Sequence, residues 1–201
     1  GALTAGVDEL HARDLAATIF VAPAFLGGGS FWWDLLADSQ SGLNAATRLR
    51  ALTECQGLNE DVLRLARTIR LPVAELPDHA RCSSIDELNS ALAYKNISVA
   101  AHTWNHPNLL ALSDAELTDE LSRSLTWLET FGSRSLPMIS YPYGLADRRV
   151  KIAAKEAGYS AAFMIDGGWT GLSRPDRFAI PRLNISANVS EHGFTLRTAG
   201  I

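Results

Sequence analysis

Residues 99–107 read VAAHTWNHP, an apolar run that delivers two histidines and then ends at a proline. Three residues separate His102 from His106, a spacing that would place both side chains on one face of a helix. Proline disfavours the helical conformation in the residue before it, so we expect His106 to be extended and the pair to lie in a loop. The apolar run is typical of the buried end of a parallel strand, where α/β proteins gather their active sites.

The spacing of the two imidazoles leaves two interpretations open. They are either two ligands of one divalent metal ion, or two loop histidines that hydrogen-bond to the backbone. A zinc ion normally takes about three or four ligands from the protein. Two histidines alone therefore leave such a site incomplete.

The composition predicts one domain over residues 1–201, long enough to bury a full core. Its 18 basic and 22 acidic side chains give a net charge of -4 without a basic cluster, so nucleic acid is not an expected partner. The two cysteines, Cys55 and Cys82, have no C-x-x-C spacing and indicate neither a disulfide framework nor a thiolate metal site. No apolar run could span a membrane and no signal peptide is visible, so a cytoplasmic protein is expected. Nothing in the sequence indicates an oligomeric state.

Helical and strand patterns alternate along the chain. Capping-box sequences begin helices at Ser84 and Ser113, and Asp147 is expected to cap another. Strands are expected over residues 16–21, 99–101, 138–141, 161–165 and 178–183. This alternation predicts a mostly parallel sheet or barrel. The chain enters a helical pattern directly after Gly1, where a β/α protein normally has a strand, so we expect its first strand to lie upstream.

Residues 39–78 are polar and helical, and we interpret them as an insertion in the alternating pattern. Within it, Asn59 is expected to cap a helix. Just before it, Trp32 and Trp33 are adjacent and cannot both face inward on one helix or strand. Either one of them lines a cleft, or both cover apolar surface in a loop.

Two motifs in this order resemble the polysaccharide deacetylases with NodB homology. The first is HTWNHPNL at residues 102–109, and the second, one helix later, is YPYG at residues 141–144. The resemblance implies a distorted (β/α) barrel in which His102, His106 and one aspartate bind zinc or a similar divalent ion. It also implies that the backbone N–H of Tyr143 helps to hold the oxyanion of the tetrahedral intermediate.

The sequence departs from the family pattern at three places. The family's metal-binding aspartate and its general base lie in an Asp-Asp-Gly motif, and this sequence begins with Gly1 where that glycine would fall. Ser140 occupies the place of an arginine found in many members, so the contact of that arginine is lost or supplied by another residue. His192 is a weak match for the family's general-acid histidine.

The resemblance implies a metal-dependent hydrolase of C–N amide bonds that deacetylates an N-acetylated sugar or polysaccharide. Trp33, Trp104 and Tyr141 could stack on a sugar face and are the expected substrate-binding residues. The missing aspartates leave open a non-catalytic protein on the same scaffold that binds carbohydrate or a partner. A further alternative keeps the hydrolysis but changes the substrate to a non-sugar amide.

Overall fold

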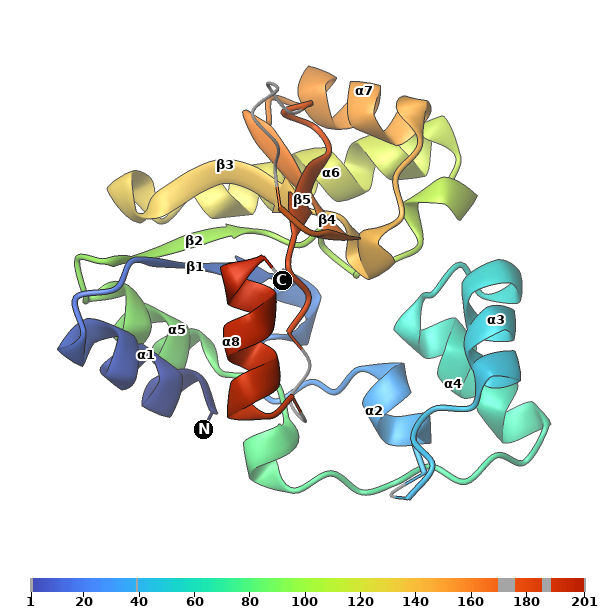
Figure 1. Cartoon of the computed structure of the whole chain (residues 1–201). Helices are drawn as coiled ribbons and strands as arrows, with labels where there is room; N and C mark the ends of the chain where they lie inside the picture. Colours follow the sequence, from blue (N-terminus) through green and yellow to red (C-terminus); the bar gives the residue numbers. More distant parts are fainter. Residues whose placement is uncertain (1, 39, 170–175, 186–188, 201) are drawn as a thin grey trace.

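The computed structural model describes residues 2–38, 40–169, 176–185 and 189–200. Its centre is a curled sheet of five parallel strands in the order β1-β2-β3-β4-β5 (Figure 1). The prediction of a parallel sheet is therefore confirmed. The strands are β1 (Ala17–Val21), β2 (Ile97–Ala101), β3 (Ser135–Ser140), β4 (Ala161–Gly167) and β5 (Ile180–Arg182).

The register of the strands determines which residues meet at the carboxyl edge of the sheet. Strands β1 and β2 pair without a break up to Val21 and Ala101, and Ala101 in turn pairs with Ile139 of β3. The next residue, His102, donates its backbone N–H to the Val21 carbonyl oxygen at 2.8 Å. The segments after β2 and β3 therefore leave the sheet side by side.

Eight α-helices and five 3-10 helices occur in the described part of the chain. Helix α1 packs on α5, while α6 packs on β2, β3 and α7. The capping boxes at Ser84 and Ser113 are both present, and the Asp147 side chain accepts from the Val150 N–H as predicted. The α-helices are α1 (Ala2–Ala12), α2 (Trp32–Leu36), α3 (Ala45–Glu54), α4 (Asn59–Thr68), α5 (Ile85–Leu92), α6 (Asp114–Glu129), α7 (Arg148–Glu156) and α8 (Glu191–Ala199). The 3-10 helices are η1 (Pro23–Phe25), η2 (Asp78–Ala80), η3 (Leu109–Ala111), η4 (Gly132–Arg134) and η5 (Pro142–Gly144).

The main core lies between the sheet and the helices that cover it. Val99, Ala100 and Ala101 are fully buried, so β2 is covered on both faces. This explains the apolar run from Val99 to Ala101, because a parallel strand covered on both faces has no side that faces solvent. In the described part of the chain, each helix is too short or too polar to cross a membrane.

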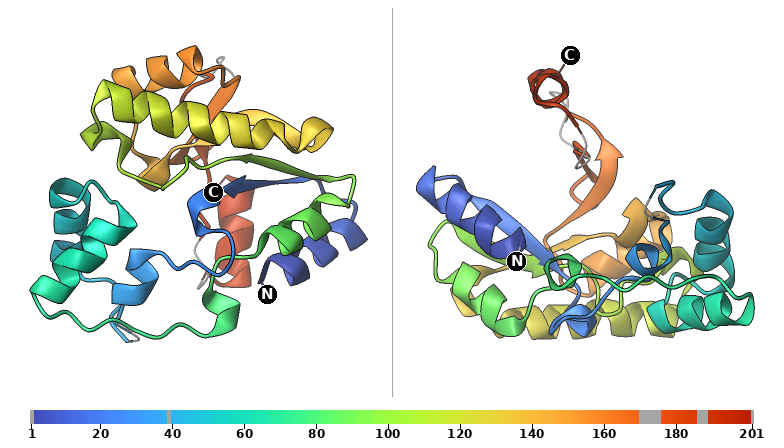
Figure 2. Two further views of the ribbon diagram at one scale, coloured as in Figure 1. Left: turned by 180° about the vertical axis from the view of Figure 1, so that it is seen from behind. Right: turned by 90° about the horizontal axis from the view of Figure 1, so that it is seen from below.

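Helices α2, α3 and α4 form a separate group with a small core of their own. Both views of Figure 2 show α3 and α4 together, on the side away from α1 and α5. Trp32, Ala51 and Val62 are buried in this second core. The prediction that Asn59 caps α4 is wrong: Leu58 is the N-cap, and the Asn59 side chain accepts instead from the Trp32 N–H at 2.6 Å. Asn59 thus connects α4 to the aromatic segment before it.

Candidate active site

His102 and His106 face each other at the carboxyl edge of the sheet. Their Nε2 atoms lie 3.1 Å apart, and their ring planes are nearly perpendicular. The Nδ1 atom of His102 lies 2.6 Å from the Ser140 carbonyl oxygen, which can only accept. His102 must therefore carry its proton on Nδ1 and present an unprotonated Nε2. The two rings converge through Nε2, as two ligands of one ion would.

Both imidazoles are neutral at physiological pH. Burial, with a smaller contribution from the charge of Arg182, lowers the pKa of His102 to about 4. Burial and the neighbouring His102 lower the pKa of His106 well below its ordinary value. Neutral imidazole is the form that binds metal ions. The environment therefore keeps both side chains in the ligand form.

The loop that carries the histidines has an unusual backbone. Thr103 and His106 have φ of 63° and 54°, in the left-handed region that non-glycine residues seldom adopt. The prediction of a loop is confirmed, but the prediction that His106 is extended is wrong. The proline disfavours the right-handed helical conformation, and the chain turns through the left-handed region instead, held by a hydrogen bond from the His106 N–H to Thr103 Oγ1 at 3.1 Å. Such strain persists only where surrounding contacts enforce it.

Glu120, on α6, makes several of the contacts that hold this backbone in place. It is 7% exposed, and its Oε2 atom accepts the backbone N–H groups of Trp104 at 2.8 Å and Asn105 at 3.0 Å. Its Oε1 atom accepts from Asn105 Nδ2 at 2.6 Å. One buried carboxylate therefore fixes the segment between the two histidines.

Tyr143 lies in the turn η5 with φ 58° and ψ 2°. The turn is closed by the N–H groups of Gly144 and Leu145, which donate to Tyr141 and Pro142. Among the described residues, the Tyr143 N–H takes part in no backbone hydrogen bond. It is thus available as a donor, as the oxyanion role predicted for it requires.

The insertion is fastened to this turn and to the histidine loop. The Tyr143 hydroxyl donates to the Gly57 carbonyl at 3.1 Å and accepts from Trp32 Nε1 at 3.0 Å. The Asn108 N–H donates to the Gln56 carbonyl at 2.6 Å. Gly57, with φ +70°, lies so close that an added Cβ would be 2.9 Å from Tyr143 Cε2. The insertion therefore forms a fixed wall of the site.

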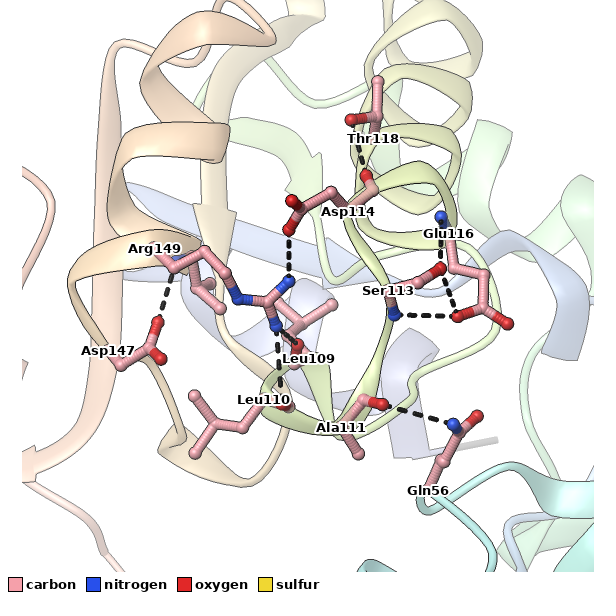
Figure 3. Close-up of polar contacts among 11 residues, drawn as sticks. Gln56, Leu109, Leu110, Ala111, Ser113, Asp114, Glu116, Thr118, Asp147 and Arg149 are labelled. Atoms are coloured by element: carbon pink, nitrogen blue, oxygen red, sulfur yellow. Dashed lines mark hydrogen bonds and ion pairs between the residues drawn. The ribbon is translucent and has the colours of Figure 1, made fainter.

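The segment that follows the histidine loop is anchored from both sides (Figure 3). The Arg149 guanidinium, on α7, donates to the carbonyls of Leu109 at 3.1 Å and Leu110 at 3.3 Å. From the insertion, Gln56 Nε2 donates to the Ala111 carbonyl at 3.2 Å. These contacts connect α7 and the insertion through the same short 3-10 helix.

A cavity of about 520 Å³ opens over the histidines. Trp33 forms part of its wall, with its ring centroid 4.9 Å from that of His106 and 5.7 Å from that of Tyr143. Phe31 stacks on Trp33 at 4.3 Å between centroids, which fixes the indole. The cavity is lined by Trp32, Trp33, Asp34, Ala37, Leu43, Arg48, His102, His106, Tyr141, Tyr143, Ile165 and Arg182.

The structure places the other expected site residues as follows. Tyr141 lines the cavity but is 1% exposed, and its hydroxyl donates to the Phe178 carbonyl. Trp104 does not line this cavity; its ring packs on the Arg123 guanidinium, 3.9 Å from the ring centroid. His192 is exposed on α8, which Figure 2 shows well away from the insertion.

Arg182 is a site residue that lies outside both sequence motifs. Its Nη2 atom donates to Ser140 Oγ at 2.9 Å and its Nε atom to the Met164 carbonyl at 2.6 Å. Strand β5 thus brings a guanidinium to the position where Ser140 replaces the family arginine. A charged residue inside a short apolar strand is the signal that could have identified it.

The two histidines fit part of a metal site. Among the buried side-chain nitrogen and oxygen atoms of the described residues, His106 Nδ1 is the one that has no hydrogen-bond partner. In the described part of the chain, no third histidine, cysteine, aspartate or glutamate joins the pair. The residues present therefore supply two nitrogen ligands, and any further ligand comes from elsewhere.

A parallel sheet with a pair of neutral histidines and an unpaired N–H at its carboxyl edge defines an α/β protein with a hydrolase-like site. Comparison with known proteins then assigns the family. The sequence pattern described as polysaccharide deacetylase matches residues 59–162, about half of the chain. This chain belongs to the polysaccharide deacetylase family.

One curated relative is chitin deacetylase 3 from Cryptococcus neoformans, 28% identical over 86 residues. That match covers 41% of this chain and 21% of the relative, so the chain spans about a fifth of the relative's length.

Solved structures of similar fold include the deacetylase PplD of Streptococcus pyogenes in complex with acetate, at a TM-score of 0.60 and 16% identity. IcaB from Ammonifex degensii follows at 0.58 and 14%, and a de-N-acetylase from Aggregatibacter actinomycetemcomitans at 0.58 and 15%. The matches cover 96%, 96% and 94% of this chain, and 62%, 65% and 68% of those structures, respectively. At these identities the likeness establishes the fold.

Proposed function

We propose that this chain carries the catalytic centre of a metal-dependent deacetylase, which removes acetyl groups from an N-acetylated sugar or polysaccharide. The convergence of His102 Nε2 and His106 Nε2 at 3.1 Å carries the proposal. Tyr143 and Trp33 line the same cavity, so the residues to which we assign metal binding, oxyanion binding and sugar stacking lie around one space. Family membership supports the reaction.

In this proposal His102 and His106 hold a divalent ion, for which zinc is our expectation. When bound, the ion supplies Lewis acidity toward the acetamide carbonyl. Ser140 fixes the tautomer of His102 through its carbonyl oxygen, a supporting contact of the kind that orients metal ligands. The remaining ligand and the general base are carboxylates in the family that the sequence resembles, and we expect both from outside the described residues.

The Tyr143 N–H serves as a donor to the oxygen that becomes negative when the acetamide carbon turns tetrahedral. A backbone donor held before the reaction needs no reorganisation as that charge develops. The left-handed φ of 58° and the anchored phenol keep this N–H in place. Trp33 offers its ring face for stacking on the sugar.

Acetate release from N-acetylglucosamine oligomers by the full-length protein in the presence of zinc tests this proposal. We expect release by the unmodified full-length protein to exceed that of its His106→Ala variant. The Arg50→Ala variant is a suitable control, because Arg50 lies outside the cavity and pairs with Glu54. Equal release by His106→Ala and the unmodified chain would contradict a role for the histidine pair.

A second candidate is a non-catalytic carbohydrate-binding protein on the same scaffold. The absence of a third acidic or histidine ligand among the described residues favours it. It predicts that the oligomers bind in isothermal titration calorimetry without acetate release. It also predicts that His106→Ala binds them as tightly as the unmodified chain, whereas Trp33→Ala binds more weakly.

A further inference from the structure

We propose that Arg48, on α3 of the insertion, binds an acidic group of the substrate. The cavity would then select an N-acetylated glycan that carries a carboxylate or a phosphate near the acetamide. This inference rests on the proposed function, because it places a sugar in the cavity. It assigns a substrate-selecting role to a segment that lies outside the histidine and tyrosine motifs.

Arg48 lines the same cavity as both histidines. It lies near Tyr143, where its positive charge partly offsets the rise in the pKa of the phenol that burial causes. A sugar held over the histidines would therefore present one of its neighbouring substituents to this guanidinium.

Among the described residues, Arg48, Arg67 and Arg70 are the arginines of the insertion whose side chains have no protein partner, and of these three Arg48 is the one that lines the cavity. Arg50 pairs with Glu54 at 2.8 Å, and Arg64 pairs with Asp61 at 2.9 Å. Within the described residues, the Arg48 side chain forms no hydrogen bond and no ion pair. A guanidinium offers a planar set of five donors that matches the oxygens of a carboxylate or phosphate. The donors of Arg48 are available for such a group.

The helix that carries Arg48 is held in position relative to the catalytic groups. Just after α3, the Gly57 and Gln56 carbonyls accept from the Tyr143 hydroxyl and the Asn108 N–H. Asn108 Nδ2 also donates to the Leu52 carbonyl, within α3 itself, at 3.1 Å. A charged side chain on a fixed helix loses less freedom on binding than one on a mobile loop.

Two other charged side chains line the cavity. Arg182 is engaged by the Ser140 hydroxyl and the Met164 carbonyl, so it belongs to the support of the histidine site. Asp34 carries a carboxyl whose pKa is raised by burial. Its negative charge would oppose an acidic ligand. Loss of the Arg48 charge should therefore weaken binding of an acidic ligand, and loss of the Asp34 charge should strengthen it.

Binding of three probes by isothermal titration calorimetry tests the inference. They are an N-acetylglucosamine tetramer, a tetrasaccharide of alternating N-acetylglucosamine and glucuronate, and N-acetylglucosamine 6-phosphate. We expect Arg48→Ala to weaken binding of the acidic probes about tenfold, the effect of losing one charge-assisted hydrogen bond. Binding of the neutral tetramer should change less than about twofold. Arg50→Ala, on the same helix, should leave the affinity for all three probes unchanged. Asp34→Asn should raise the affinity for the two acidic probes only.

The outcomes separate this inference from the proposed function. If Arg48→Ala weakens binding of only the glucuronate probe or only the phosphate probe, that probe identifies the acidic group. Equal loss for acidic and neutral probes in Arg48→Ala overturns the inference, as does tighter binding of the neutral tetramer by the unmodified chain. If the neutral tetramer is deacetylated and Arg48→Ala has no selective effect, the proposed function stands and only the inference fails. If no probe binds and none is deacetylated, the proposed function fails.

Discussion

Glu120 holds Asn105 by two hydrogen bonds, from the backbone N–H to Oε2 at 3.0 Å and from Nδ2 to Oε1 at 2.6 Å. Asn105 immediately precedes His106, whose φ of 54° is unfavourable for a residue with a side chain. Helix α6 thus determines the path of the loop that carries the histidine pair. The geometry of the site depends on a residue that does not touch the cavity.

Replacing Glu120 with alanine should destabilise the protein and separate the two imidazoles. The N–H groups of Trp104 and Asn105 would lose their acceptor; an unpaired donor costs about 1–3 kcal/mol when fully buried, and we expect the lower end of that range for these half-buried groups. Urea unfolding measures this change. Glu120→Gln is the matched control, because its amide oxygen can still accept both N–H groups. Equal destabilisation by the two variants would contradict the proposed clamp.

Gly57→Ala should disturb the Tyr143 turn. The new Cβ would lie 2.9 Å from Tyr143 Cε2, and the residue would keep a φ of +70°. Gly42 is the matched control, since its φ is +72° and no atom lies within 4 Å of its Cβ position. Left-handed strain costs about 1–3 kcal/mol at either position. We expect Gly57→Ala to lower the free energy of unfolding further than Gly42→Ala, and equal losses would show that the contact with Tyr143 is unimportant.

The stability of the protein should fall in alkaline solution partly because of Tyr143. Burial raises the pKa of its phenol to about 12, against about 10 in an unfolded chain. The native state therefore retains this proton while the unfolded state loses it, so the contribution is complete below about pH 10 and is lost as the pH rises toward about 12.

Tyr143→Phe removes that part of the pH dependence. Between pH 9 and pH 11 the unmodified chain should lose about 1 kcal/mol more than the variant in denaturant unfolding. Burial raises the pKa of Tyr141 and Tyr159 also, so the variant should keep some of the decline. Identical pH profiles for the two proteins would contradict a protonated, buried Tyr143.

Much of the fold could be predicted from local patterns. The apolar run before His102 identified β2, and the capping boxes at Ser84 and Ser113 identified the starts of two helices. These signals are local, because strand burial and helix capping depend on residues a few positions apart. His102 and His106 could likewise be identified as a pair, because they lie only four positions apart in the sequence.

The supporting residues could not be predicted, because their partners are distant in sequence. Arg182 contacts Ser140 across 42 positions, and Gly57 contacts Tyr143 across 86. Trp104 was expected to stack on a sugar because it is aromatic; its ring packs on Arg123 and does not line this cavity, and its role in substrate binding stays a prediction. The left-handed φ of His106 also escaped prediction, since it is imposed by Thr103 and the Glu120 clamp. Local sequence indicates which residues carry the chemistry, and the tertiary contacts determine where they point.

Nitrogen-15 NMR of the histidine rings during zinc titration tests the central claim most directly. If His102 and His106 bind one ion, their Nε2 resonances will shift together and saturate at one equivalent. Replacement of either histidine should then abolish the shift of the other. Zinc-independent Nε2 resonances, or a shift of one ring that persists after replacement of its partner, would contradict a shared metal site.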